Sequence, residues 1–162
     1  MEDKFDLAKF KQLYKPMQVK YGLPEFEKLN EDFEIEKAAD NETDFVLREV
    51  RKYIADKVIN YFRFLESILN PSSSPSLFIF SISKTLNGAD KEKMVEIYKK
   101  LARVEVQLME LDVGYSEEKE AKFINETYIL WQEIKKELKE IVDIIRKNWD
   151  NKAEDNSKGY FG

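Results

Sequence analysis

The stretch that decides the fold is residues 43–69, which read TDFVLREVRKYIADKVINYFRFLESIL. Its large apolar residues recur at intervals of three and four, which is the spacing of one face of an α-helix. This face consists of Leu47, Val50, Ile54, Val58, Tyr61, Leu65 and Ile68. The apolar side is widened by Phe45, Tyr53, Phe62 and Leu69. A stripe this wide predicts a long helix that packs against more than one neighbour.

A second long helix is predicted over about 90–112. Its main apolar face consists of Met94, Ile97, Leu101, Val104, Leu108 and Leu111. A second apolar edge is formed by Val95, Tyr98, Ala102, Val106 and Met109. The short link over 113–116 contains Gly114 as a helix stop and Ser116 as a helix cap. Such a short link makes the helices on either side antiparallel neighbours.

The third long helix is predicted over about 117–149. Its apolar residues keep heptad spacing and are Ile124, Thr127, Trp131, Ile134, Leu138, Ile141 and Ile145. At 1.5 Å per residue this helix would be roughly 50 Å long. It is longer than its two expected partners, so we expect its far end to be bare or to pack in a dimer.

Shorter helices are expected elsewhere. Two lie before residue 40, where Pro16 should kink or end the first helix and Gly22 should stop it. Two prolines and four serines make residues 70–76 a loop. The apolar segment at 77–86 begins after Ser76, a good helix cap, which predicts a short buried helix rather than a strand.

These patterns predict an all-α protein. We expect a helical bundle of three long helices, at about 43–69, 90–112 and 117–149, joined by shorter N-terminal helices and a short helix near 77–86. Residues 1–149 are predicted to form one domain, and residues 150–162 a polar C-terminal tail. The chain is 43% hydrophobic, which is too apolar for a disordered protein.

The chain contains neither histidine nor cysteine. Their absence removes the usual proton shuttle at neutral pH, the thiolate nucleophile and the soft metal ligands. An all-oxygen cation site would need inward-facing carboxylates, for which Glu105 and Glu126 are the best placed. We expect no metal, no cofactor and no catalytic residue, and we favour a role without catalysis.

The net charge of −5 is unevenly distributed. Residues 23–49 hold ten acidic and three basic side chains, including the acidic group Glu31, Asp32 and Glu34. One hypothesis is that the acidic segment 23–44, which contains these three residues, docks on the basic turn of the same chain or of a partner. That turn consists of Arg48, Arg51 and Lys52. A mildly acidic chain with interleaved charges does not predict nucleic-acid binding.

Two function hypotheses follow. The first is a protein-interaction, scaffolding or regulatory role, with self-association as a homodimer through apolar helix surface left over from the core. Tyr160 and Phe161 are further interaction candidates at the end of the polar tail. The alternative is a small-anion-binding protein or enzyme with a helical pocket, built from Arg63, Arg103 and Glu105.

The expected location is the cytoplasm, without membrane attachment. The N-terminus is charged and lacks the apolar core of a signal peptide. The longest apolar run is only residues 77–80, far shorter than a membrane-spanning helix requires.

Overall fold

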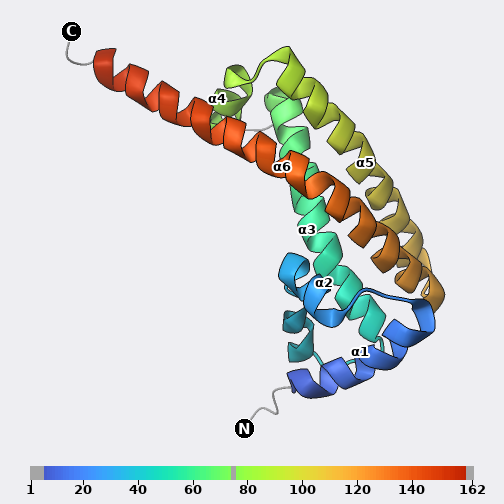
Figure 1. Cartoon of the computed structure of the whole chain (residues 1–162). Helices are drawn as coiled ribbons and strands as arrows, with labels where there is room; N and C mark the ends of the chain where they lie inside the picture. Colours follow the sequence, from blue (N-terminus) through green and yellow to red (C-terminus); the bar gives the residue numbers. More distant parts are fainter. Residues whose placement is uncertain (1–5, 74–75, 160–162) are drawn as a thin grey trace. The chain divides into compact units, whose positions relative to one another are not determined.

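The structure, a computed structural model, describes residues 6–73 and 76–159, with side chains up to Lys152 and at Glu154. This part of the chain forms six α-helices and two short 3₁₀ helices, without a strand, which confirms the predicted all-α fold (Figure 1). In chain order they are α1 Leu7–Tyr21, α2 Phe26–Phe33, η1 Ile35–Asp40, α3 Val46–Leu69, η2 Pro71–Ser73, α4 Leu77–Thr85, α5 Gly88–Val113 and α6 Glu117–Gly159.

Local signals set most of the helix ends. Gly22 ends α1 in the left-handed conformation, with φ of 62°, which glycine adopts without steric cost. The side chains of Ser76 and Ser116 cap α4 and α6 by accepting backbone N–H groups of Ile79 and Lys119. Pro16 lies inside α1, so the alternative that this helix ends near Lys15 is wrong.

The beginning of α5 differs from the expected one. A reciprocal pair of hydrogen bonds links Asn87 and Asp90, in which each side chain accepts the backbone N–H of the other residue. Asn87 is therefore the cap and Asp90 the third residue of the first turn, an arrangement that satisfies two free amide groups of the helix end. The helix consequently begins at Gly88 rather than at residue 90.

The chain packs as two units. Unit 1 combines Met1–Asn60 with Arg103–Trp131, and unit 2 combines Tyr61–Ala102 with Gln132–Gly162. Each of the three long helices, α3, α5 and α6, supplies residues to both units. A single domain over residues 1–149 stays a prediction.

Unit 1 has a core rich in aromatic side chains. The ring of Phe26 in α2 contacts the rings of Phe10 and Tyr14 in α1, with centroids 6.2 and 5.7 Å apart. Phe33 at the end of α2 contacts Trp131 of α6 at 5.6 Å. The Tyr14 hydroxyl donates a hydrogen bond of 2.7 Å to the carbonyl of Pro24, so its polar end is satisfied within the core.

Unit 2 is built from the end of α3, all of α4, the beginning of α5 and the remainder of α6. Its core is aliphatic and consists of Leu65, Ile68, Ile82, Met94, Ile97, Leu101, Ile134, Leu138 and Ile141. Beside it, the rings of Phe62 and Tyr98 stack at 4.9 Å between α3 and α5. Members of the predicted apolar stripes of α3, α5 and α6 therefore share this core, as their spacing indicates.

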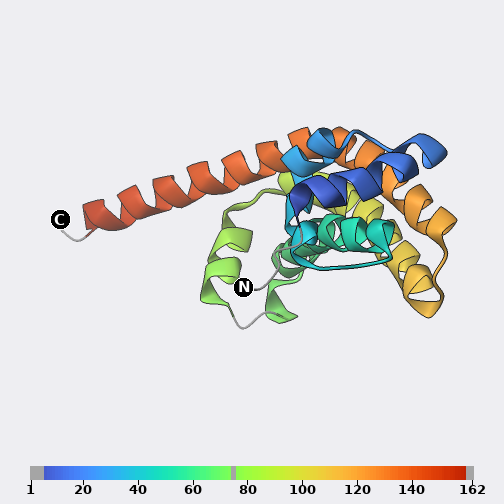
Figure 2. The ribbon, with the colours of Figure 1, turned by 90° about the horizontal axis from the view of Figure 1, so that it is seen from below.

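The predicted end of the third long helix at residue 149 is wrong. The helix continues to Gly159, ten residues beyond the predicted end at residue 149, and within unit 2 it runs past α4 (Figures 1 and 2). Residues 150–159 contain no proline to end the helix, and their polar residues carry no apolar stripe by which it could be recognised. Tyr160 and Phe161 lie outside the described residues.

Candidate functional site

The most prominent surface feature of unit 2 is a group of apolar side chains at the junction of α4 and α6. We call it the α4–α6 patch, and it consists of Leu77, Phe78, Phe80 and Trp149. Leu77 is 83% exposed, and even the large Trp149 side chain is 42% exposed. Contiguous exposed apolar side chains commonly mark binding surfaces, whereas scattered ones do not.

The sequence of α4 explains why the patch exists. The helix begins Leu-Phe-Ile-Phe, so apolar side chains point to all sides of its first turn. A single packed face can bury only some of them, and the described buried residues of α4 are Ile82 and Ser83. The predicted helix near 77–86 is therefore confirmed, but the expectation that it is buried is wrong for its first turn.

Three contacts fix α4 and its patch: an aromatic contact and a hydrogen bond with α6, and a hydrogen bond with α3. The rings of Phe78 and Trp149 meet at 5.2 Å in an edge-on arrangement. Asn148 donates a side-chain hydrogen bond of 3.0 Å to the carbonyl of Thr85, which ties α6 to the end of α4. The buried Ser83 hydroxyl donates to the carbonyl of Ile68 at 2.9 Å, which ties α4 to α3.

The rim of the patch carries more positive than negative charge. The Lys84 ammonium lies 4.2 Å from the ring centre of Phe80. The exposed basic residues on α6 around Trp149 are Arg146, Lys147 and Lys152. The acidic residues of the same stretch are Asp143, which pairs with Arg146 at 3.7 Å, Asp150 and the exposed Glu154. Four cations against three carboxylates leave this rim weakly basic.

Unit 1 carries a second apolar surface, on the C-terminal part of α5. We call it the α5 stripe, and it consists of Val106, Met109 and Val113. The spacing of three and four places the three side chains on one face of the helix, and Val113 is 90% exposed. The ionisable residues over 103–113 are Arg103, Glu105, Glu110 and Asp112, so the rim of this stripe is acidic.

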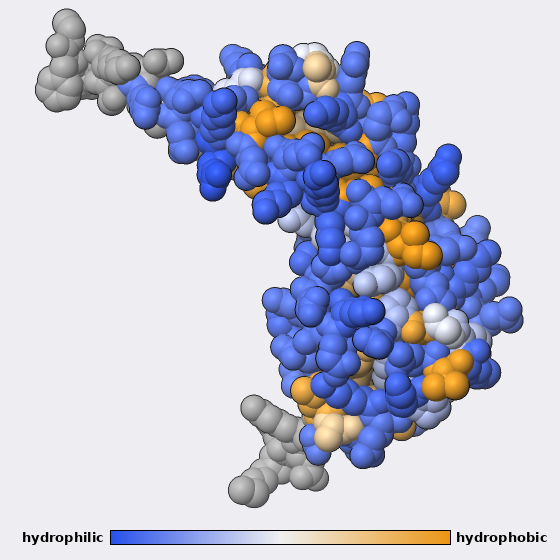
Figure 3. Space-filling model, viewed as in Figure 1, coloured by the Kyte–Doolittle hydropathy of each residue, from blue (hydrophilic) through white to orange (hydrophobic). Residues whose placement is uncertain are grey.

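Isolated orange side chains interrupt the mostly blue surface of the face drawn in Figure 3.

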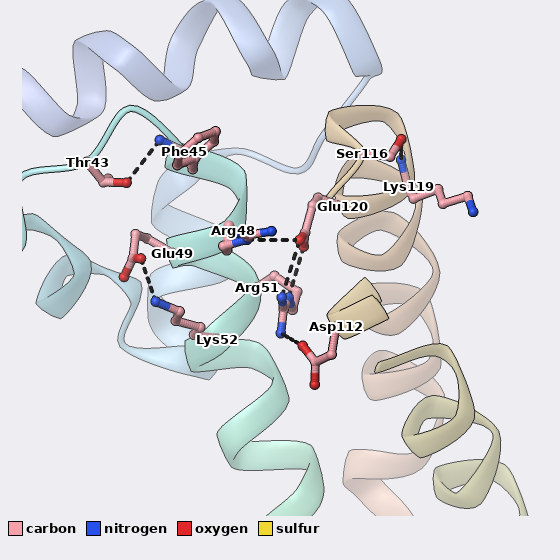
Figure 4. A network of polar contacts seen from close by, with 10 residues as sticks. All are labelled: Thr43, Phe45, Arg48, Glu49, Arg51, Lys52, Asp112, Ser116, Lys119 and Glu120. Carbon is pink, nitrogen blue, oxygen red and sulfur yellow. Dashed lines mark hydrogen bonds and ion pairs between the residues drawn. The ribbon is translucent and has the colours of Figure 1, made fainter. Parts of the chain in front are cut away.

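A buried ion-pair network lies within unit 1, between α3, α5 and α6 (Figure 4). The carboxylate of Glu120 is fully buried and accepts two hydrogen bonds from the Arg51 guanidinium, at 2.9 and 3.3 Å. Arg51 also reaches Asp112 at 3.4 Å. A bidentate pair of this kind satisfies a carboxylate that burial would otherwise destabilise strongly.

Arg48 completes the network from the solvent side. Its Nε lies 3.7 Å from Glu120 and has no hydrogen-bond partner among the described residues. Its guanidinium lies 4.6 Å from the ring centre of Tyr115 and 5.5 Å from that of Phe45. Burial, together with the negative charges of Glu117 and Glu120, raises the pKa of Tyr115. This arrangement satisfies the charges internally and is typical of a structural network.

The three basic residues of the predicted turn thus form ion pairs with different partners. Arg48 and Arg51 pair with Glu120, whereas Lys52 pairs with Glu49 of the same helix at 2.6 Å. Among the acidic candidates, Glu34 forms an ion pair with Lys37. Glu31 is exposed and Asp32 is partly buried, both on α2.

The residues of the anion-binding alternative belong to different units, Arg63 to unit 2 and Arg103 and Glu105 to unit 1, and none of them lines either of two hollows found among the described residues. Arg63 and Arg103 are exposed, and Glu105 is half-buried. These two hollows have volumes of about 350 and about 120 Å³. The first is lined by Glu66, Leu69, Asn70, Val95, Tyr98 and Lys99. The second is lined by Gln107, Glu110, Leu111, Lys119, Lys122, Phe123 and Glu126.

Within residues 6–73 and 76–159, no three Asp or Glu side chains are grouped so that they could hold a metal ion. Over the same ranges, every helix is too short or too polar to cross a membrane.

Sequence reasoning missed Glu120 and the exposure of the α4–α6 patch. A signal for Glu120 was present, because it lies four residues before Ile124 and so continues the apolar face of α6. Arg51 similarly lies between Leu47 and Ile54 on the apolar side of α3. Opposite charges on two packed apolar faces predict a buried ion pair.

Comparison with known proteins adds no assignment: no family model, curated protein or solved structure matches this chain.

Proposed function

We propose that this chain is a protein-interaction module that self-associates through the α4–α6 patch. The observation that carries the proposal is the exposure of four large apolar side chains on α4 and α6, where Phe78 contacts Trp149 and hydrogen bonds hold α4 to α3 and α6. Bulky aromatic residues at the centre of an interface contribute much of its binding energy. The patch offers three aromatic rings and one leucine.

The rigidity of the surface supports the same role. Ser83 and Asn148 fix α4 to α3 and α6, so little conformational freedom is lost when a partner binds. An interface of ordinary size covers about 800 Å² on each partner, and its apolar centre is surrounded by a polar rim. The charged side chains around Trp149 provide such a rim. The proposal retains a cytoplasmic location, which a chain without cysteine fits.

The alternative of an anion-binding protein or enzyme has less support. It requires cationic side chains that face a pocket and are shielded from water. Arg63 and Arg103 are exposed and line neither of the two hollows, and the buried Arg51 is already paired with Glu120.

The test is the mass of the protein in solution. Sedimentation velocity at micromolar concentration should show wild-type protein larger than a monomer. The change Leu77→Glu places a charge in the patch, and we expect it to weaken association at least about tenfold. Leu77 is so exposed that this change should leave the fold intact.

The matched control is Val19→Glu on α1, where the valine is 75% exposed and lies outside the patch. We expect this variant to associate as the wild type does. A monomeric wild-type protein, or a Leu77→Glu variant that associates normally, would show that the proposed function is wrong.

A further inference from the structure

We infer that the partner bound by the α4–α6 patch is the α5 stripe of a second copy of this chain. This inference rests on the proposed function and specifies how the copies meet. The association is head-to-tail, because the patch of one copy binds a different surface, the stripe, of the next copy. Each copy carries one of each surface, in unit 2 and unit 1 respectively.

The two surfaces are comparable in size. Val106 and Val113 are seven residues apart on α5, so the stripe extends for about 10 Å. The nine residues of α4 extend for about 13 Å. The stripe offers short aliphatic side chains and the flexible thioether of Met109, whereas the patch offers aromatic rings. Methionine packs favourably against aromatic rings.

The charges that border each surface indicate whether the patch binds another patch or a stripe. The stripe is bordered by Glu105, Glu110 and Asp112 against one cation, Arg103. Neither Glu105 nor Glu110 forms an ion pair with another described residue, whereas Asp112 is shared with Arg51. The neighbouring hollow places Glu110 beside Lys119, Lys122 and Glu126. Over residues 103–113 themselves, three carboxylates stand against one cation, so the border of the stripe is acidic in sequence.

The patch has the opposite sign, because the four cations around it outnumber Asp143, Asp150 and Glu154 by one. Patch against patch would bring two basic rims together, and stripe against stripe would bring two acidic rims together. Like charges across an interface are unfavourable, and opposite charges favour association. The head-to-tail pairing is the one arrangement of these two surfaces in which both apolar centres are covered and the rims attract.

A mixing experiment tests this geometry. The variant Leu77→Glu retains a normal stripe, and the variant Met109→Lys retains a normal patch. Each variant alone lacks one of the two surfaces, so we expect each to be monomeric at a concentration where the wild type associates. An equimolar mixture should form a one-to-one dimer, because the stripe of one variant binds the patch of the other.

Native mass spectrometry reads this result directly when one variant is labelled with ¹⁵N, since mixed dimers then have an intermediate mass. Circular dichroism should first show that each variant has wild-type helix content. Val113→Lys provides a second stripe variant at a still more exposed position, in case Met109→Lys does not fold. Val19→Lys and Val19→Glu are the charge-matched controls and should associate as the wild type does.

The outcomes separate the inference from the proposed function. If Leu77→Glu is monomeric but both stripe variants associate normally, the patch binds something other than the stripe, and only the inference is overturned. A mixture that stays monomeric overturns it as well. If Leu77→Glu itself associates like the wild type, the proposed function fails together with the inference.

Discussion

Glu120 carries a fully buried carboxylate whose charge is balanced by Arg51 and Arg48. Removing one partner from a buried ion pair leaves the other charge desolvated and unpaired. We expect Glu120→Gln to lower the free energy of unfolding by about 3 kcal/mol, measured by urea denaturation. The exposed neighbour Glu118 provides the control, and Glu118→Gln should change stability by less than about 0.5 kcal/mol.

A double variant tests whether the charge itself is needed. In Arg51→Met with Glu120→Leu, both members of the buried pair are replaced by apolar groups of similar size, and the two residues that lose a partner, Arg48 and Asp112, are partly or largely exposed. We expect this protein to be more stable than Glu120→Gln. A double variant that is less stable would indicate that the network has geometric roles beyond mutual neutralisation.

Glu117 confers a predictable dependence on pH. Its carboxylate accepts hydrogen bonds from the Tyr21 hydroxyl at 2.7 Å and from Lys20 at 3.0 Å, and these hold the pKa of Glu117 below its usual value. The unfolded chain therefore takes up this proton more readily than the folded one, and acid favours unfolding. The contribution of Glu117 to the free energy of unfolding is complete above the pKa of about 4.3 that it has in the unfolded chain. This contribution is lost as the pH falls through the lower pKa of Glu117 in the folded protein.

Glu117→Gln removes this titration. We expect the midpoint of thermal unfolding to fall less between pH 5 and pH 3 in the variant than in the wild type, as measured by circular dichroism. At pH 7 the variant should be the less stable of the two. Equal acid sensitivity in both proteins would show that other carboxylates account for the acid response.

Among the helices, α4 is attached to α3 by a hydrogen bond from one buried hydroxyl. Ser83 donates to the carbonyl of Ile68 at the end of α3, and its removal leaves that carbonyl without this donor. We expect Ser83→Ala to cost about 1 kcal/mol and to speed amide hydrogen exchange within α4. The comparison is Ser67→Ala, whose hydroxyl bonds within its own helix to Arg63 and whose loss should leave α4 unchanged.

Helix boundaries show which signals the sequence carries well. Gly22, Ser76 and Ser116 act where their types predict, because a cap is satisfied by amide and carbonyl groups one turn away. The end of α6 was misplaced because the prediction followed apolar spacing, which stops near Trp149. The backbone continues as a helix through polar residues to Gly159.

At the scale of the whole molecule, the proposed association joins an acidic stripe to a basic rim. Charges on an exposed rim are screened by salt, since the Debye length falls from about 10 Å at 0.1 M to about 3 Å at 1 M. We therefore expect the dissociation constant of the wild-type assembly to rise between 0.05 and 0.5 M sodium chloride, as measured by sedimentation. Apolar contacts alone would be strengthened or unchanged at the higher salt concentration.

Glu110→Gln gives the matched comparison, because it removes one rim charge and keeps the shape of the side chain. Its assembly should be weaker than that of the wild type at low salt and nearly equal to it at high salt. A variant equally weakened at both salt concentrations would place Glu110 in a direct contact rather than in the screened rim.

The candidate surfaces could be predicted only in part. The sequence shows that 77–80 is apolar and that Val106 and Met109 form a second edge on their helix. Whether such residues are core or surface depends on what packs against them, and that is not a property of the segment itself. Ile82 and Leu77 have similar hydrophobicity, yet Ile82 is buried and Leu77 faces solvent.

Local sequence patterns set the positions of the helices, apart from the polar end of α6, because the 3.6-residue period and the caps act within one or two turns. The sequence by itself also determined the absence of histidine and cysteine chemistry. Only the tertiary structure decided that Glu120 meets Arg51, 69 residues away. It also decided which apolar faces remain uncovered: a helix can carry more apolar width than its neighbours can bury, and the number and position of those neighbours are set by packing of the whole chain.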